Sequence, residues 1–151
     1  MCVFPFEPAL YEGTGLRCEF IGHPLTTQIS FNPDPAVSAA ALNLPVNGLI
    51  LGVLPGSRES EVKRLLPLFL AVFDRLVAED KDLVGVIPAA SGNLYKLIQS
   101  MVGLRPMRVV HGKSQEVIAA SKAVLVASGT AALESVLTGR PTVAAYKMNP
   151  W

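Results

Sequence analysis

The feature that most constrains the fold is a regular alternation of short apolar runs with helical segments, which begins near Gly48. The apolar runs are short enough to be strands buried on both faces of a sheet, and they fall at residues 49–54, 83–88, 107–110, 123–127 and 142–145. Between them lie segments with helical periodicity, at residues 59–79, 93–102, 114–120 and 130–137, with Pro67 expected to kink the first or to start a new helix. This alternation predicts an α/β fold with a doubly wound, Rossmann-like parallel sheet.

The composition limits the class of protein. The chain has 151 residues, enough for one ordinary domain or for one domain with a piece of another. Charged residues make up 17%, against a usual share of about 25%, so much of the chain is expected to be buried. A net charge of +1 with scattered Lys and Arg argues against nucleic-acid binding. The sequence shows neither an apolar run of the ~18 residues of a membrane span nor a signal-peptide pattern, which leaves peripheral membrane contact open.

The N-terminal part is less regular. Residues 7–12 predict a short helix, residues 17–21 alternate as a strand does, and residues 36–42 predict a second helix after a proline-containing linker. An apolar strand candidate at Met1 with nothing before it suggests a truncated piece. Cys2 and Cys18 lack the spacing of a metal or redox pair and have apolar neighbours, so we expect buried, reduced thiols and a reducing cytosol.

Two motifs follow strands that the fold brings together. If the strand order is 3-2-1-4-5, residues 49–54 lie beside residues 123–127, and ligands bind where the carboxyl ends of these strands meet. The first motif is PGSR at residues 55–58, where Gly56 lets the backbone approach a ligand, Ser57 can cap the helix and Arg58 supplies a planar cation. Free amides at a helix N-terminus together with a guanidinium are suited to phosphate.

The second motif is ASGTAALE at residues 127–134, in which Ser128, Gly129 and Thr130 repeat these features without the Arg. Two helix N-termini at one crevice suit a diphosphate, and Glu134, one turn into its helix, could accept hydrogen bonds from a ribose. Alternatively each corner is simply a well-capped helix, since Ser and Thr are ordinary N-caps. The presence of both corners at neighbouring strands favours a ligand site.

Other chemistry is weakly supported. Neither a P-loop nor a dinucleotide fingerprint occurs, so adenine dinucleotide cofactors are poorly supported and no cofactor is expected. Asp80 and Asp82 precede a strand, at the opposite edge of the sheet, and are interpreted as a solvated turn with no metal. His23 and His111 are not favoured as catalytic residues. Glu61 could steady Arg58 across the helix surface as easily as touch a ligand.

Several motifs in order resemble the lipid-A-disaccharide synthase family. They are PFEP with Tyr11, FIGHP at residues 20–24, LPGSR with Glu61 and Val62, residues 127–134, and YKM at residues 146–148. The resemblance implies a two-domain GT-B glycosyltransferase. Residues 1–24 would end the N-terminal acceptor domain, residues 25–47 would form an interdomain linker and helix, and residues 48–151 would form an incomplete UDP-sugar-binding domain.

The same resemblance implies the reaction. Enzymes of this family transfer 2,3-diacylglucosamine from its UDP form to 2,3-diacylglucosamine 1-phosphate with inversion, releasing UDP, and GT-B enzymes generally need no divalent metal. By resemblance the UDP-sugar would be bound by Gly56, Ser57, Arg58, Ser128, Gly129, Thr130 and Glu134. No catalytic residue can be assigned, because the family's proposed base lies in a missing N-terminal half. The implied location is the cytoplasm, with peripheral association on the inner membrane possible.

Two alternatives stay open on the sequence. One is another GT-B enzyme that uses a UDP-sugar, such as a peptidoglycan glycosyltransferase or a UDP-sugar epimerase. These families place a differently composed loop where PGSR stands. The other is a nucleotide-binding module without catalysis of its own.

Overall fold

The computed structural model describes residues 1–147, and Met148 of the last motif therefore lies outside the described part. The chain divides into two compact units, Met1–Ser30 and the part from Phe31 onward. This division falls inside the segment that the sequence assigns to a linker. In the described residues no helix combines the length and the apolar character needed to cross a membrane.

The first unit is small and has little regular structure. It contains two short helices, α1 (Glu7–Leu10) and α2 (Leu25–Gln28), where the sequence predicted one helix over residues 7–12 and then a linker. The strand predicted over residues 17–21 is wrong, because only an isolated parallel bridge joins Cys2 to Phe20. With no neighbouring strand among these residues to complete a ladder, the alternating pattern does not produce a strand.

The expectation of two free thiols is also wrong. Cys2 and Cys18 form a disulfide, with their Cα atoms 6.5 Å apart. Backbone hydrogen bonds align the two segments, since the Cys2 amide donates to the Glu19 carbonyl (2.8 Å) and the Ile21 amide donates to the Cys2 carbonyl (3.0 Å). Small units that cannot bury a large core commonly depend on such cross-links. The cysteines therefore give no support to a reducing compartment.

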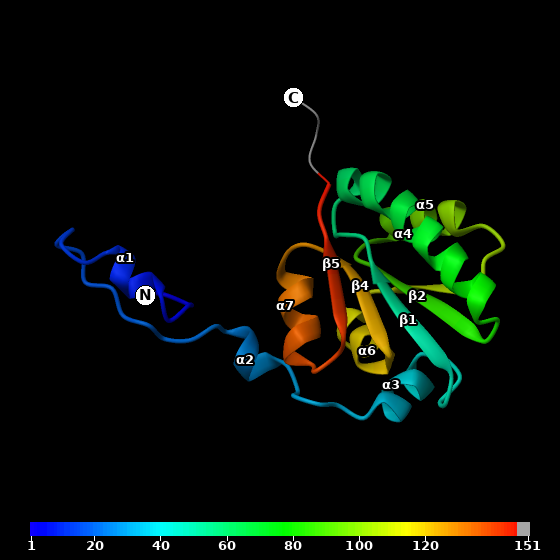
Figure 1. Cartoon of the computed structure of the whole chain (residues 1–151), viewed down its shortest axis with the longest axis horizontal. Coiled ribbons are helices and arrows are strands. Elements are labelled where there is room, and N and C mark those ends of the chain that lie inside the picture. The colour runs from blue at the N-terminus through cyan, green and yellow to red at the C-terminus, as the bar shows by residue number, and fades with distance from the viewer. Residues whose placement is uncertain (148–151) are drawn as a thin grey trace. The chain divides into compact units, whose positions relative to one another are not determined.

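The second unit is built on a five-stranded parallel sheet (Figure 1), as predicted. The strand order is β3-β2-β1-β4-β5, which is the order on which the predicted ligand site depends. The strands are β1 (Leu49–Leu54), β2 (Leu83–Ala89), β3 (Met107–His111), β4 (Ala123–Ala127) and β5 (Thr142–Ala145). The central strands are buried on both faces, which explains why the sequence shows them as continuous apolar runs.

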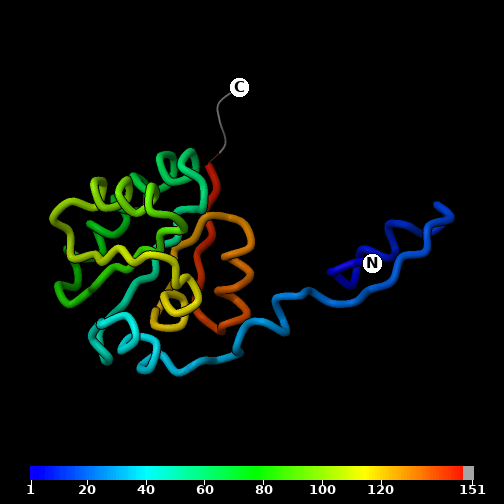
Figure 2. Tube along the Cα trace, turned by 180° about the vertical axis from the view of Figure 1, so that it is seen from behind, coloured from blue at the N-terminus to red at the C-terminus, as the bar shows by residue number. Residues whose placement is uncertain are grey.

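Helices cover both faces of this sheet (Figures 1 and 2). On one face α4 and α5 pack into a core that includes Val62, Phe69, Phe73 and Ile98. On the other face α3, α6 and α7 pack against a second core that includes Leu42, Val117 and Val126. The helices are α3 (Pro35–Ala41), α4 (Glu59–Glu79), α5 (Gly92–Val102), α6 (Ser114–Ala120) and α7 (Thr130–Leu137).

Helix α4 runs unbroken through Pro67, so the alternative that a new helix starts at this proline is wrong. Pro67 lies on the exposed face, whereas Leu66 and Phe69 on either side of it are buried against the sheet. A proline costs a helix one backbone hydrogen bond, and the burial on both sides of it offsets that loss.

Within the second unit, two arginines hold the segment before β1 against the sheet region. Arg140 donates from Nη2 to the Pro33 carbonyl (2.9 Å), and Arg108 donates from Nη1 to the Asn43 carbonyl (2.9 Å). Helix α3 also packs on α6. Residues 33–43, which the sequence assigns to the interdomain linker and helix, are therefore held against the sheet, and α3 confirms the helix predicted over residues 36–42 within one residue.

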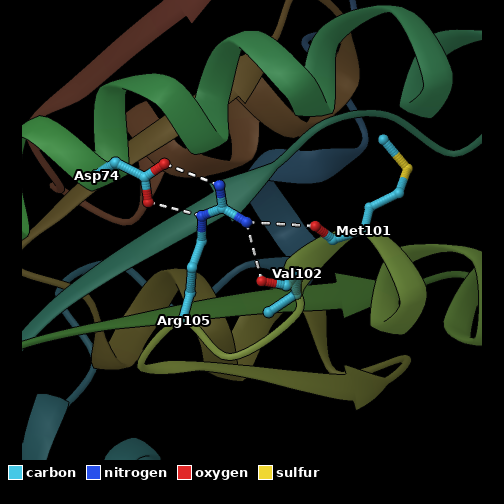
Figure 3. Close-up of polar contacts among 4 residues, drawn as sticks. All are labelled: Asp74, Met101, Val102 and Arg105. Carbon is cyan, nitrogen blue, oxygen red and sulfur yellow. Dashed lines mark hydrogen bonds and ion pairs between the residues drawn. The ribbon is translucent and has the colours of Figure 1, made fainter.

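A third arginine, Arg105, joins α4 to the end of α5 (Figure 3). The Arg105 guanidinium binds both carboxylate oxygens of Asp74, at 2.6 and 2.8 Å. It also donates to the carbonyls of Met101 (3.4 Å) and Val102 (3.0 Å) in the last turn of α5. Its side chain thus satisfies carbonyls that a helix end leaves without partners. The hydrogen bond from Arg105 lowers the pKa of the Asp74 carboxyl.

Replacing Arg105 by Ala should lower the free energy of unfolding by about 1 kcal/mol, the range of a partly exposed ion pair together with a helix cap. Asp74→Asn should cost less, because the carbonyl contacts remain. The folded-state pKa of Asp74 is lowered. The stabilisation by the ion pair is therefore fully present at pH values above the unfolded-state pKa of about 3.9, and it is lost as the pH falls through the folded-state pKa. Urea unfolding at several pH values measures this.

The exposed pair of Glu59 and Lys63 in α4 gives a matched comparison, with Nζ and Oε1 2.6 Å apart. Lys63→Ala should change the stability by less than Arg105→Ala, because both side chains are well exposed. Equal losses for the two variants would contradict the role given to Arg105.

Candidate functional site

A cavity of about 410 Å³ opens where the carboxyl ends of β1 and β4 meet. The two strands are paired in register, Leu54 lying opposite Val126, so the chain leaves both strands at the same edge of the sheet. All seven residues that the sequence nominates line this cavity: Gly56, Ser57, Arg58, Ser128, Gly129, Thr130 and Glu134. The fold thus brings together two corners that are far apart in the sequence.

At the first corner the helix N-terminus is already occupied by a side chain. The Glu61 carboxylate accepts hydrogen bonds from the amides of Ser57 (3.0 Å) and Arg58 (3.2 Å). It also pairs with the Arg58 guanidinium at 2.9 Å. The expectation of free amides at this corner is therefore wrong. Nor is Ser57 the cap of α4, since Arg58 occupies the N-cap position and Glu61 supplies the acceptor.

Gly56 is required by this arrangement. Its φ of +121° is a conformation that residues with a Cβ rarely adopt. A Cβ built at this position would also lie 2.5 Å from Oε2 and 2.6 Å from Cβ of Glu61. The absence of a side chain at Gly56 therefore lets the turn close over Glu61.

At the second corner the backbone amides are open. Gly129 precedes α7 with a φ of +152°, again a conformation favouring glycine, and no side chain caps the helix. The Ser128 amide donates to the Ala145 carbonyl (2.9 Å). Among the hydrogen bonds formed within residues 1–147, none uses the amides of Gly129, Thr130 and Ala131. This corner therefore has the free donors that the sequence predicts for an anion site.

Glu134 lies one turn into α7 and lines the cavity. Burial raises the pKa of its carboxyl group, because the charged form is poorly solvated there. Within the described part of the chain its carboxylate accepts no hydrogen bond, although its main-chain carbonyl binds Thr138. A partly buried carboxylate without donors is able to accept hydrogen bonds from a bound hydroxyl group.

Sequence reasoning missed part of the cavity wall. Residues 88–90 at the end of β2, together with Gly112 and Ser114 after β3, also line it. Their position after strands that end at the same carboxyl edge could have predicted this. They were not predicted because none of them carries a charge. Glu61 also lines the cavity, and the sequence left its role open.

The other residues considered from the sequence lie elsewhere or have local partners. Asp80 caps the C-terminus of α4 and accepts a hydrogen bond from the Asp82 amide (2.9 Å), as in a tight turn before β2. His23 accepts from the Leu25 amide through Nδ1 (3.2 Å), which is a local turn contact in the first unit. Across the described residues, no three or more His, Cys, Asp or Glu side chains form a group suited to a metal ion.

Comparison with known proteins identifies the family. A model of the lipid-A-disaccharide synthetase family matches residues 1–151. The chain belongs to this family. The lipid-A-disaccharide synthase of Cupriavidus pinatubonensis is 41% identical over 154 residues, covering 100% of this chain and 38% of the relative. That of Pseudomonas aeruginosa is 42% identical over 151 residues, covering 98% and 40%. The chain thus spans about 40% of the length of these family members.

The fold of this family member is similar to that of a known glycosyltransferase. A structure of ADP-heptose lps heptosyltransferase II from E. coli aligns with a TM-score of 0.57 over 74% of this chain and 36% of the other, at 18% sequence identity. The chain therefore has the α/β, Rossmann-like architecture of GT-B type that the sequence predicts.

Glu134→Gln should raise the melting temperature at pH 7. The folded-state pKa of Glu134 lies above its unfolded value of about 4.3, so the charged carboxylate costs stability. That cost is absent below the unfolded pKa and appears as the pH rises through the folded-state pKa. The difference between Glu134→Gln and wild type should therefore disappear near pH 3, as measured by thermal unfolding followed by circular dichroism.

Glu59→Gln is the control, because Glu59 is exposed on the first turn of α4. It should not produce a gain at pH 7 that vanishes in acid. A lower melting temperature for Glu134→Gln at pH 7 would mean that the carboxylate is stabilised by a partner, contrary to the geometry.

Proposed function

We propose that this chain is the UDP-sugar-binding part of a lipid-A-disaccharide synthase. The whole enzyme would transfer 2,3-diacylglucosamine from its UDP form to 2,3-diacylglucosamine 1-phosphate, giving lipid A disaccharide 1-phosphate and UDP. The observation that carries the proposal is the cavity at the β1 and β4 ends, where the free amides of α7, the Arg58 guanidinium and the Glu134 carboxylate meet. The family match supports a lipid-A-disaccharide synthase, and the resemblance of the sequence motifs to that family implies these substrates.

The cavity suits a nucleoside diphosphate as leaving group. In the transfer, an acceptor hydroxyl forms a bond to the anomeric carbon while the bond from that carbon to the β-phosphate oxygen breaks. Negative charge then grows on the β-phosphate, and fixed donors directed at it lower the barrier. The amides of Gly129, Thr130 and Ala131 and the guanidinium of Arg58 would be those donors. Glu134 would accept hydrogen bonds from the ribose hydroxyls.

The remaining assignments follow from the family and are part of the proposal. Residues 1–24 would end an acceptor-binding domain. Residues 25–47 would form the interdomain linker together with helix α3, which packs on the sheet domain, and the UDP-sugar domain would start at residue 48. The base that takes the proton from the acceptor hydroxyl would come from a part of the enzyme that this chain does not match. The enzyme would work in the cytoplasm, at the face of the inner membrane where its lipid substrates lie.

The donor site is tested by UDP binding to the 151-residue chain, measured by calorimetry. Arg58→Ala and Glu134→Ala should each weaken UDP binding at least about tenfold, or ~1.4 kcal/mol, the range for charge-assisted hydrogen bonds. Double replacement of Asp80 and Asp82 by Asn should leave the affinity unchanged, because these residues precede β2 at the opposite edge of the sheet. Unchanged affinity in both Arg58→Ala and Glu134→Ala would overturn the site assignment.

The reaction is tested with a chimera in which this chain replaces the matching part of the Cupriavidus pinatubonensis relative. The chimera should form disaccharide from the authentic donor and acceptor, with Arg58→Ala lowering kcat/KM, whereas the chain alone should give no turnover. UDP binding shows that the chimera is folded. A chimera that binds UDP without turnover would favour the alternative of a binding module that does not support catalysis.

A further inference from the structure

We propose that Glu61 is a positioning residue that acts as an internal anion. It occupies the N-terminus of α4, fixes Arg58 toward the cavity and leaves the ligand's diphosphate to the amides of α7. This inference rests on the proposed function, because it assigns the two corners different parts in binding the same UDP-sugar.

The contacts of Glu61 occupy the backbone amides of Ser57 and Arg58 and one nitrogen of the Arg58 guanidinium. Oε2 accepts the amides of Ser57 and Arg58, and Oε1 binds Nη1 of Arg58. A phosphate oxygen at an N-terminus of this kind would need the same two amides. The corner is thus already satisfied by a side chain of the protein, and Gly56 packs against it with no space for a Cβ.

Arg58 needs such a partner to be held in place. Its side chain is 78% exposed, whereas that of Glu61 is 34% exposed. An exposed arginine loses considerable side-chain freedom when it binds a ligand, and an existing ion pair at Nη1 removes part of that loss in advance. The remaining donors of the planar guanidinium are left for a phosphate oxygen.

The charges of the cavity also assign different roles to the two corners. Among the described residues that line it, the charged ones are Arg58, Glu61 and Glu134. Since Glu61 balances Arg58, the attraction for a diphosphate cannot come from net charge. It has to come from oriented donors, and the open amides are those of α7. The bonds from Arg58 and Ser57 are also strong enough to lower the pKa of Glu61 although its burial acts to raise it.

A double-mutant cycle on UDP affinity tests the positioning role in the 151-residue chain. Glu61→Ala should weaken UDP binding about fivefold when Arg58 is present and less than twofold in an Arg58→Ala background, because Glu61 acts through Arg58. Glu61→Gln, which keeps an acceptor for the amides, should show a smaller loss. Glu59→Gln removes the same charge from the same helix turn and should leave the affinity unchanged.

Amide hydrogen exchange and the NMR signals of the Arg58 guanidinium give a readout that needs no ligand. In the wild type the Ser57 and Arg58 amides should be protected and rotation of the guanidinium slowed, and both effects should be lost in Glu61→Ala. Addition of UDP should preserve the protection of these two amides and shift the amide signals of Gly129, Thr130 and Ala131.

Three results would overturn the inference. They are tighter UDP binding in Glu61→Ala, additive losses in the cycle, and loss of the Ser57 and Arg58 amide protection on UDP addition. The first and third would make Glu61 an anion that the ligand displaces. If the wild type fails to bind UDP, the proposed function fails, and the exchange and guanidinium measurements still decide whether Glu61 fixes Arg58.

Discussion

The parallel pairing of β1 with β4 is the constraint on which the site depends. Because Leu54 lies opposite Val126, both strands end at the same edge and the chain turns into a helix at each end. The two helices then pack on opposite faces, α4 in one core and α7 against the other. Their N-termini therefore reach the cavity from two sides. Val53 of β1 and Val126 of β4 are completely buried, one in each of the two cores.

The strands of the sheet domain could be predicted from the sequence because the burial of each strand determines the residue types within that strand. Strands buried on both faces have to be apolar throughout, so β1 and β4 stand out as short runs between helices. In the N-terminal unit two predictions were wrong. The alternation at residues 17–21 did not give a strand, because the described residues contain no partner strand for it. The disulfide was not predicted, because no spacing rule links Cys2 to Cys18. At the site, residue types indicated which positions face the cavity. The occupation of the α4 amides by Glu61 depends on a side-chain rotamer, which a sequence pattern does not determine.

Two carboxylates of the same cavity illustrate how environment sets acidity. Glu61 receives three hydrogen bonds, and these lower its pKa against the effect of burial. Glu134 receives none within the described residues, and burial raises its pKa. The Glu61 carboxylate already has its hydrogen-bond partners within the protein, without a ligand. The Glu134 carboxylate carries a cost that a ligand hydroxyl would relieve, as is common where a binding site is maintained at the expense of stability.

The arginine contacts to Pro33 and Asn43 bear on motion within the chain. Arg140 and Arg108 hold these two carbonyls, so the backbone between them has to travel with the sheet domain. The segment from Pro33 to Asn43 and the strands that carry the cavity therefore behave as one body.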